Sequence, residues 1–332
     1  MQAPVAVDVR SPKLNTLAAL IVALVLGGAV ALLELGGARG GRGVEQTLNQ
    51  ALAAGGGLRS GRLDLSFSVS SRGASALPAA RSLRVQGPFQ SGARGRLPSF
   101  ALTLVARDRH DLRVAVTSTG RQLFVALRDM PFVAPESTLR ELAQRYSQAS
   151  AGAGASGPGA VSGAMRVDPR RWLIAPRREG SARVDGVSTV HIGGGLDLAR
   201  FLIDVDRVGG AGAVLAPGSS GAHPARITAA QQAALARSLS SSHVDVYAGS
   251  RDHLLRVLRA TATLNVPLDA RVALGGLTEA TMTFELAFSD VNRAQVIVAP
   301  AHPRPAGALL AALSALESKG ARAGAHRATG GP

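Results

Sequence analysis

Apolar and polar residues alternate along several stretches of the sequence, and this period of two limits the possible folds more than any other feature. In residues 61–71, Leu63, Leu65 and Phe67 alternate with arginine, aspartate and serine. Successive side chains of a strand point to opposite faces, so the pattern predicts a strand with one apolar and one wet face. Similar runs occupy residues 100–104, 112–116 and 123–127.

The last third of the chain returns to the same pattern. Met282, Phe284, Leu286 and Phe288 alternate with small or polar residues in the stretch ATMTFELAFSD. This alternation predicts another half-buried strand. Strands are also predicted at residues 244–246, 251–264 and 295–300.

Residues 182–192, ARVDGVSTVHI, have the pattern of a hairpin. Asp185 and Gly186 separate two short strand-like runs. A two-residue type I′ turn requires positive φ at both central positions, which Asp-Gly tolerates well. The hairpin contains one histidine, His191, and no recognisable catalytic pattern.

Helices are predicted between the strand groups. Ser137 is the expected N-cap of a helix over 137–150, Thr228 caps another over 228–239, and Pro169 opens a helical turn. Further helices are expected at residues 44–57, 196–206 and 305–316. Because no crossover helix follows the individual strands, the sequence predicts an α+β fold with one antiparallel sheet and helices on its apolar face.

The N-terminal region contains a candidate membrane span. Residues 16–33 are uncharged and mostly apolar, and as a helix they would extend about 27 Å, close to the thickness of a bilayer core. A cleaved signal peptide is the alternative, since residues 29–31 form an A-x-A pattern. The apolar run exceeds the usual ~7–15 residues of a signal peptide, which favours an uncleaved anchor.

The net charge of +15 does not predict a nucleic-acid-binding protein. The positive residues are nearly all scattered arginines, and aromatic residues make up only 3% of the chain, so stacking platforms are lacking. The chain has no cysteine, which excludes disulfides, thiol catalysis and a lipid-modified cysteine. Weak attraction to anionic lipid headgroups is the expected use of the charge.

The polar residues show no pattern typical of an active site. The histidines lack metal-binding spacing on a helix, and no G-x-S-x-G elbow is present. The pairs Asp204 with Asp206 and Asp108 with Asp111 are expected to be solvated, and His253 with Asp252 is expected in a surface salt-bridge network. No enzyme activity, catalytic residue, metal site or cofactor is predicted.

The predicted sheet has one apolar face and few bulky side chains to fill the space above it. Such a face packs into a core or lines a cavity for an apolar ligand. The side chains expected to line such a cavity are Leu63, Leu65, Phe67, Leu102, Leu104, Met282, Phe284 and Phe288.

Several sequence blocks resemble the actinobacterial LppX- and LprG-like lipoproteins, relatives of LolA-type carriers and RseB-type sensors. They include Asp168-Pro169 with Trp172, Glu179-Gly180 leading to the hairpin, and the strand that follows Asp252. The resemblance implies a curved half-barrel sheet around helices, with a cavity for acylated lipids or lipoproteins. Family members are commonly anchored through a lipidated cysteine, whereas here the apolar helix would replace it.

Together these inferences divide the chain into a short cytoplasmic tail (1–13), a transmembrane anchor (14–35), a glycine-rich link (36–43), a LolA/LppX-like domain (44–318) and a disordered tail (319–332). The expected protein is a single-pass membrane protein with an extracytoplasmic domain that binds a lipid or lipoprotein acyl chain. The alternative is a sensor or protein-interaction domain on the same fold, without bound lipid and with a partner in the cell envelope.

Overall fold

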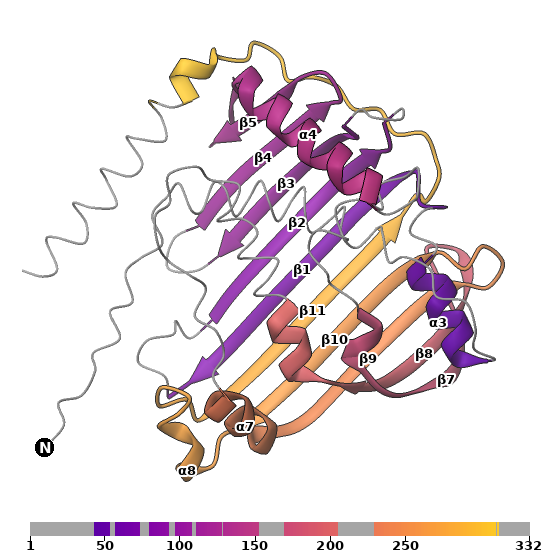
Figure 1. Cartoon of the computed structure of the whole chain (residues 1–332), viewed down its shortest axis with the longest axis vertical. Helices are drawn as coiled ribbons and strands as arrows, with labels where there is room; N and C mark the ends of the chain where they lie inside the picture. Colours follow the sequence, from indigo (N-terminus) through magenta and orange to yellow (C-terminus); the bar gives the residue numbers. More distant parts are fainter. Residues whose placement is uncertain are drawn as a thin grey trace, which may run out of the picture.

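A single antiparallel sheet of eleven strands forms the centre of the protein (Figure 1). The structure is a computed structural model, and it describes residues 43–53, 57–73, 80–92, 97–107, 111–127, 129–152, 169–204, 229–309 and 311. The strands are β1 (Ser60–Arg72), β2 (Ala80–Gln90), β3 (Ser99–Arg107), β4 (Asp111–Thr119), β5 (Leu123–Leu127), β6 (Met130–Val133), β7 (Leu173–Val184), β8 (Val187–Leu196), β9 (Leu239–Gly249), β10 (Leu255–Asn265) and β11 (Glu279–Ser289).

The order of the strands is β6-β5-β4-β3-β2-β1-β11-β10-β9-β8-β7. Strands that are neighbours in sequence therefore pair, except β6 and β7, and the pairing of β1 with β11 joins the two halves of the chain. The strands β6 and β7 form the two edges, and the sheet is open. This agrees with the predicted antiparallel meander.

The hairpin predicted from Asp185 and Gly186 is present, and it joins β7 to β8. The two turn residues have φ values of 47° and 75°, as a type I′ turn requires. Its strands are longer than the sequence pattern indicated, because they extend back to Leu173 and on to Leu196.

Helices α3 and α4 lie over one face of the sheet, whereas α7 and α8 lie at the lower end of the strands in Figure 1. Backbone N–H groups of Thr138 and Leu139 donate to the carbonyl of Pro135, so the helix predicted to be capped by Ser137 begins one residue earlier. The described helices are α3 (Val44–Ala53), α4 (Glu136–Gly152), the 3₁₀ turn η3 (Pro169–Trp172), residues 198–204, α7 (Ala229–Ser238), α8 (Leu268–Arg271) and residues 306–309, within the helix predicted over 305–316.

The strand predicted at residues 295–300 is wrong. This segment belongs to no strand, and Val296 and Val298 are 85% and 72% exposed. The preceding strand β11 already pairs with β1 and β10, so it offers no free edge to a further strand. The chain instead crosses to the edge strand β6, where the backbone of Arg304 exchanges hydrogen bonds with Pro131 and Val133.

No helix in the part of the chain that the structure describes is long and apolar enough to cross a membrane. The predicted anchor (14–35), the tail before it and the C-terminal tail (319–332) lie outside the described residues, as does the expected cap Thr228. The prediction of an anchor therefore stays a prediction.

Candidate functional site

An unbroken row of aliphatic side chains crosses the inner face of the sheet, the face over which α3 and α4 lie (Figure 1). Each residue of the row is paired with the next one on the adjacent strand, from β5 at one side of the sheet to β8 at the other. All members are buried, at 7% exposure or less. The row, called here the aliphatic row, consists of Leu127, Val114, Leu104, Val85, Leu65, Leu286, Leu258, Val246 and Ile192.

The side chains predicted to line a cavity lie on this inner face. Leu63 is paired with Phe288 across β1 and β11, and Phe67 is paired with Phe284. Phe67 is partly buried, whereas the other predicted residues are all buried. Alternation along the strands was therefore sufficient to assign the predicted lining residues to one face.

One of these residues, Phe284, is covered by protein. Its ring lies 6.1 Å from that of Trp172 and 5.6 Å from that of Phe201, both in edge-to-face geometry. Trp172 and Phe201 also contact each other, at 5.0 Å. The indole Nε1–H of Trp172 donates to Asp204 at 2.9 Å. This aromatic cluster covers the inner face of β11 at Phe284.

Asp204 corrects one prediction from the sequence. It was expected to be solvated, but it is only 7% exposed and accepts the hydrogen bond of the buried indole. The carboxylate is buried because the helix over residues 198–204 turns it toward η3. Its predicted neighbour Asp206, and Asp108, lie outside the described residues.

The helices above the two halves of the sheet differ in their distance from it. The backbone of α3 comes close to β7, β9 and η3, whereas α4 makes no comparably close approach to any one strand. In Figure 1, α4 lies over the β2–β5 side of the sheet. Leu142 of α4 is buried, and Leu139 packs against the same core. The side chains by which α4 contacts the core are therefore aliphatic.

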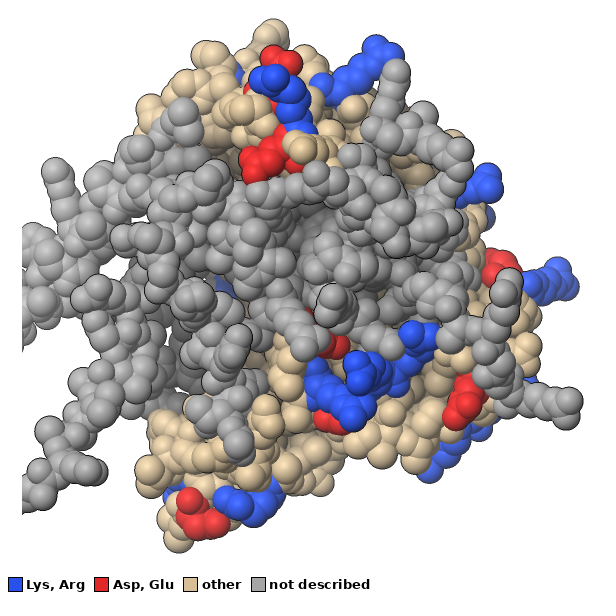
Figure 2. All heavy atoms as spheres, viewed as in Figure 1, with Lys and Arg blue, Asp and Glu red and all other residues tan. Residues whose placement is uncertain are grey.

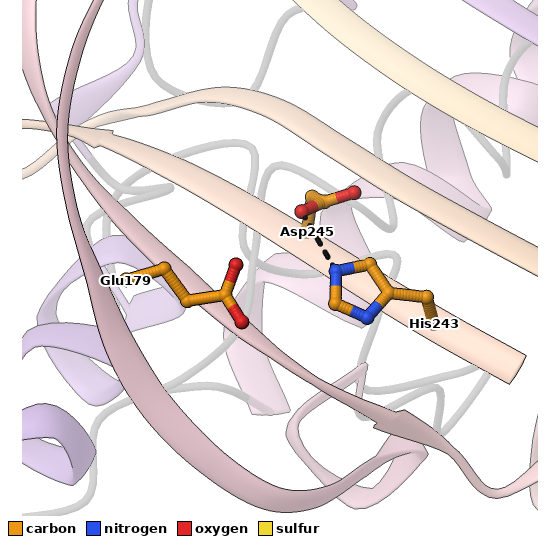
Figure 3. Close-up of side chains that lie close together, drawn as sticks. All are labelled: Glu179, His243 and Asp245. Atoms are coloured by element: carbon orange, nitrogen blue, oxygen red, sulfur yellow. Dashed lines mark hydrogen bonds and ion pairs between the residues drawn. The ribbon is translucent and has the colours of Figure 1, made fainter.

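A polar cluster lies on the opposite, outer face of β7, β8 and β9. It consists of Glu179, His191, His243 and Asp245, and three of these side chains are drawn in Figure 3. The Nε2 atoms of His191 and His243 lie 2.7 Å and 3.0 Å from the same oxygen, Oδ1 of Asp245. The Nε2 atom of His191 also lies 3.7 Å from Oε2 of Glu179. We call these four residues the outer cluster.

The backbone of β7 and β8 makes room for the outer cluster. The pairing register shifts between Arg178 and Gly180, which leaves Glu179 as an extra residue, and such bulges re-aim a side chain. A Cβ at Gly193 would lie 2.4 Å from the Glu179 carboxylate. Gly193 also faces Asp245 across the ladder. Its missing side chain therefore provides the space into which Glu179 reaches.

Charged neighbours surround this cluster. Burial raises the pKa of the Tyr247 phenol above its ordinary value, and Asp245 raises it further. The ring of Tyr247 stacks on that of His191, with the centroids 4.4 Å apart. A hydrogen bond from Arg259 to Glu285 raises the pKa of Arg259, so this guanidinium stays charged.

The expected salt-bridge network around His253 has a different composition. Asp252 pairs with Arg256, whose side chain is only 5% exposed. Nδ1 of His253 is buried without a hydrogen-bond partner, and this residue has a φ of 55°. His253 is therefore part of a tight turn, and Asp252 forms an ion pair with a buried arginine rather than belonging to a surface network.

The described residues on the helix side of the protein carry charges of both signs. Figure 2 shows arginines beside acidic groups over the described surface in this view. Many arginines also form ion pairs, including Arg84 with Asp64 and Arg72 with Glu279. This mixed pattern differs from the single-sign stripe that nucleic-acid binding requires.

Neither family models nor curated proteins match this sequence. Solved structures do match. LprF from Mycobacterium bovis has a TM-score of 0.38 and 12% identity, over 77% of this chain and 96% of LprF. The Mycobacterium tuberculosis lipoprotein LppX has a TM-score of 0.35 and 15% identity, over 77% of this chain and 98% of LppX. The chain resembles the LppX-like lipoproteins.

A third match is MucB, in its complex with MucA, with a TM-score of 0.26 and 11% identity over 78% of this chain and 63% of MucB. These similarities are distant. The fold similarity alone therefore assigns no function to the chain.

Proposed function

We propose that the chain binds an acyl chain of a lipid or of an acylated lipoprotein between the aliphatic row and α4. The observation that carries this proposal is the row itself, which is apolar from β5 to β8 and contains no aromatic ring. Flexible aliphatic side chains in a continuous strip match the chemistry of an acyl chain, and binding would remove its apolar surface from water.

The β1–β6 half of the sheet is the favoured location. Leu65, Val85 and Leu104 lie side by side on β1, β2 and β3 in this half, and α4 approaches the strands less closely than α3 does. In the other half, Trp172 and Phe201 already cover Phe284 on the inner face of β11. Leu63, Leu102 and Met282 would extend the lining along the strands.

The protein is proposed to act at the cytoplasmic membrane, with residues 14–35 as a single-pass anchor and the sheet domain outside the cytoplasm. The apolar run and the absence of cysteine support this placement, because no lipidated cysteine is available as an anchor. A tethered domain would hold or receive lipid rather than shuttle it freely. This role requires no catalytic group.

The test is native mass spectrometry of the full chain purified from a membrane-containing host, followed by lipid extraction. We expect a reproducible co-purifying acyl lipid. Leu104→Trp places a bulky ring on the aliphatic row and should reduce the bound lipid at least severalfold. The matched control is Thr103→Trp, since Thr103 is the next residue on β3 and points to the outer face.

Two outcomes would contradict the proposal. One is wild-type protein that carries no lipid under gentle conditions, and the other is a folded Leu104→Trp protein that retains lipid as well as Thr103→Trp does. Circular dichroism of both variants establishes that each is folded.

A protein-interaction domain without bound lipid is the second candidate. It is favoured by residues 295–300, where Val296 and Val298 are exposed in a segment that belongs to no strand. Exposed apolar residues next to one another are typical of docking surfaces. Lipid-free protein that binds an envelope protein, with binding lost in Val296→Ser/Val298→Ser, would favour this function over acyl binding.

A further inference from the structure

We propose that the outer cluster, Glu179, His191, His243 and Asp245, binds a zinc ion on the face of the sheet opposite to the proposed acyl site. The inference is independent of the acyl-binding proposal, because the four residues lie on the outer face. Residues of the aliphatic row, such as Val246 and Ile192, point the other way from the same strands.

The donor atoms are those that zinc prefers in the absence of cysteine. Two imidazole nitrogens and two carboxylate oxygens form a mixed N/O set, which suits zinc in a four-coordinate site. Calcium and magnesium prefer oxygen ligands alone, so the two histidines disfavour them. The proposed ion is therefore a divalent transition metal, and zinc is the common one with this ligand set.

The spacing of the donors fits a tetrahedral site. Zinc bonds of about 2.0–2.1 Å place tetrahedral ligands about 3.3 Å apart. The histidine nitrogens lie 2.7 Å and 3.0 Å from Oδ1 of Asp245, and His191 lies 3.7 Å from Glu179. The donor atoms of Glu179, His243 and Asp245 all lie within 4.8 Å of one another. These three residues would therefore form the core of the site, and a shift of the His191 ring, which lies beside Asp245 and Glu179, would add it as the fourth ligand.

The fold provides a rigid frame for these ligands. They come from three adjacent strands, and the bulge in β7 turns Glu179 toward the histidines. Gly193 leaves the space for the Glu179 carboxylate, since a Cβ there would lie 2.4 Å from it. A bulge and a glycine that together direct a carboxylate toward two imidazoles are not required by the sheet itself.

The charge at the cluster suits a divalent cation. Glu179 and Asp245 supply two carboxylates, and Arg177 pairs with Oε1 of Glu179 at 3.2 Å, which leaves Oε2 facing His191. Stacking on Tyr247 restrains the ring of His191. The four side chains are between 17% and 42% exposed, so an ion has a path from solvent to partly shielded ligands.

The test is isothermal titration calorimetry of the full chain, stripped with a chelator and titrated with zinc chloride. We expect one zinc ion per chain. Asp245→Asn and His191→Asn should each weaken its binding at least tenfold. The matched control is His302→Asn, which removes an exposed histidine remote in sequence from the cluster and should leave zinc affinity unchanged.

Two further measurements keep the test decisive if Asp245→Asn does not fold. His243→Asn removes the most exposed of the four ligands and should also weaken zinc binding. Cobalt(II) bound to the wild-type protein should give the intense visible bands of a tetrahedral site with nitrogen and oxygen ligands. Absence of zinc binding by the wild-type chain, or equal affinity in the folded His191→Asn and His243→Asn variants, would overturn the proposal.

Lipid content measured on the same samples separates the two proposals. We expect the variants that lack a zinc ligand to retain acyl lipid as the wild type does, because the sheet lies between the two sites. Loss of zinc with retained lipid therefore supports the zinc site without bearing on acyl binding.

Discussion

The two halves of the inner face, on either side of the β1–β11 pair, are filled in different ways. In the β7–β11 half, Trp172, Phe201 and Phe284 contact one another edge to face, and α3 lies close to the strands. In the β1–β6 half, buried aliphatic side chains such as Val85 and Leu104 share the inner face with Phe89, Phe100 and Phe132, and α4 stands further from the strands.

This difference suggests that the two halves of the sheet have different roles. Aromatic rings in edge-to-face contact bury much apolar surface in a fixed geometry, which stabilises a single packed state. Aliphatic side chains beneath a helix that stands further off can rearrange around a flexible guest. We therefore expect stability to depend more on the β7–β11 half and acyl binding more on the β1–β6 half.

The largest effect is expected for Trp172→Ala in the β7–β11 half. Removal of the buried indole eliminates both aromatic contacts and leaves a cavity, which should lower the free energy of unfolding by about 3–5 kcal/mol. Denaturant unfolding followed by circular dichroism measures this loss. The remaining folded protein should still carry acyl lipid.

Trp172→Phe provides the control for this variant. It keeps an aromatic ring but removes the Nε1–H that donates to Asp204, so the cost should be smaller, about 1–3 kcal/mol. If folded Trp172→Phe protein lost its lipid, the acyl site would extend into the aromatic half and the comparison would fail.

A second, smaller effect is expected for Gly87→Ala in the β1–β6 half. Gly87 has a φ of 149°, and a Cβ there would lie 2.0 Å from the carbonyl oxygen of Ala101 on β3. The strained backbone and the contact with β3 should cost about 1–3 kcal/mol, measured as a shift in the denaturation midpoint.

Gly195→Ala is the matched control on β8 in the other half. A Cβ at Gly195 would lie 3.5 Å from its nearest neighbour, an ordinary contact, so the expected change in stability is well below that of Gly87→Ala. Equal losses in the two variants would mean that the close approach of β2 to β3 does not explain the need for glycine.

Much of this fold was predictable because alternation is a local signal. The pleat of the strand alone determines that Leu63, Leu65 and Phe67 point to the same face. The turn at Asp185-Gly186 is predictable because these residue types tolerate the positive φ that the turn requires. The segment at residues 295–300 shows the limit of the same reasoning. Its residues suit a strand, but whether an edge is free depends on which strands pair, and the pairing of β1 with β11 cannot be read locally.

The outer cluster was not predicted, although its residues are all visible in the sequence. Its ligands come from three strands, so no fixed spacing such as that of two histidines on a helix links Glu179, His191 and Asp245. The only local signal is the run of glycines that follows His191. Glycines inside a strand indicate a close approach, but they do not say of what. Asp204 was misjudged for a similar reason, since its partner Trp172 belongs to a distant segment.

The smallest effects are expected on the outer face, where the two halves should behave alike. Arg84 pairs with Asp64 across β1 and β2, and Arg259 pairs with Glu285 across β10 and β11. All four side chains are at least one third exposed, so each pair should contribute about 0.2–1 kcal/mol, measured by double-mutant cycles with Arg→Gln and the matching amide.

The coupling energies of these two pairs are expected not to change with pH as long as the arginines stay charged. The paired carboxylates raise the pKa of Arg84 and of Arg259, so the contribution of each guanidinium is fully present below the ordinary arginine pKa and lost only above it. Between about pH 6 and pH 9, both guanidinium groups stay charged, so both couplings should stay constant. A coupling of several kcal/mol in one half alone would place part of the stability difference on the outer face, whereas two weak, equal couplings confine that difference to the packing of the inner face.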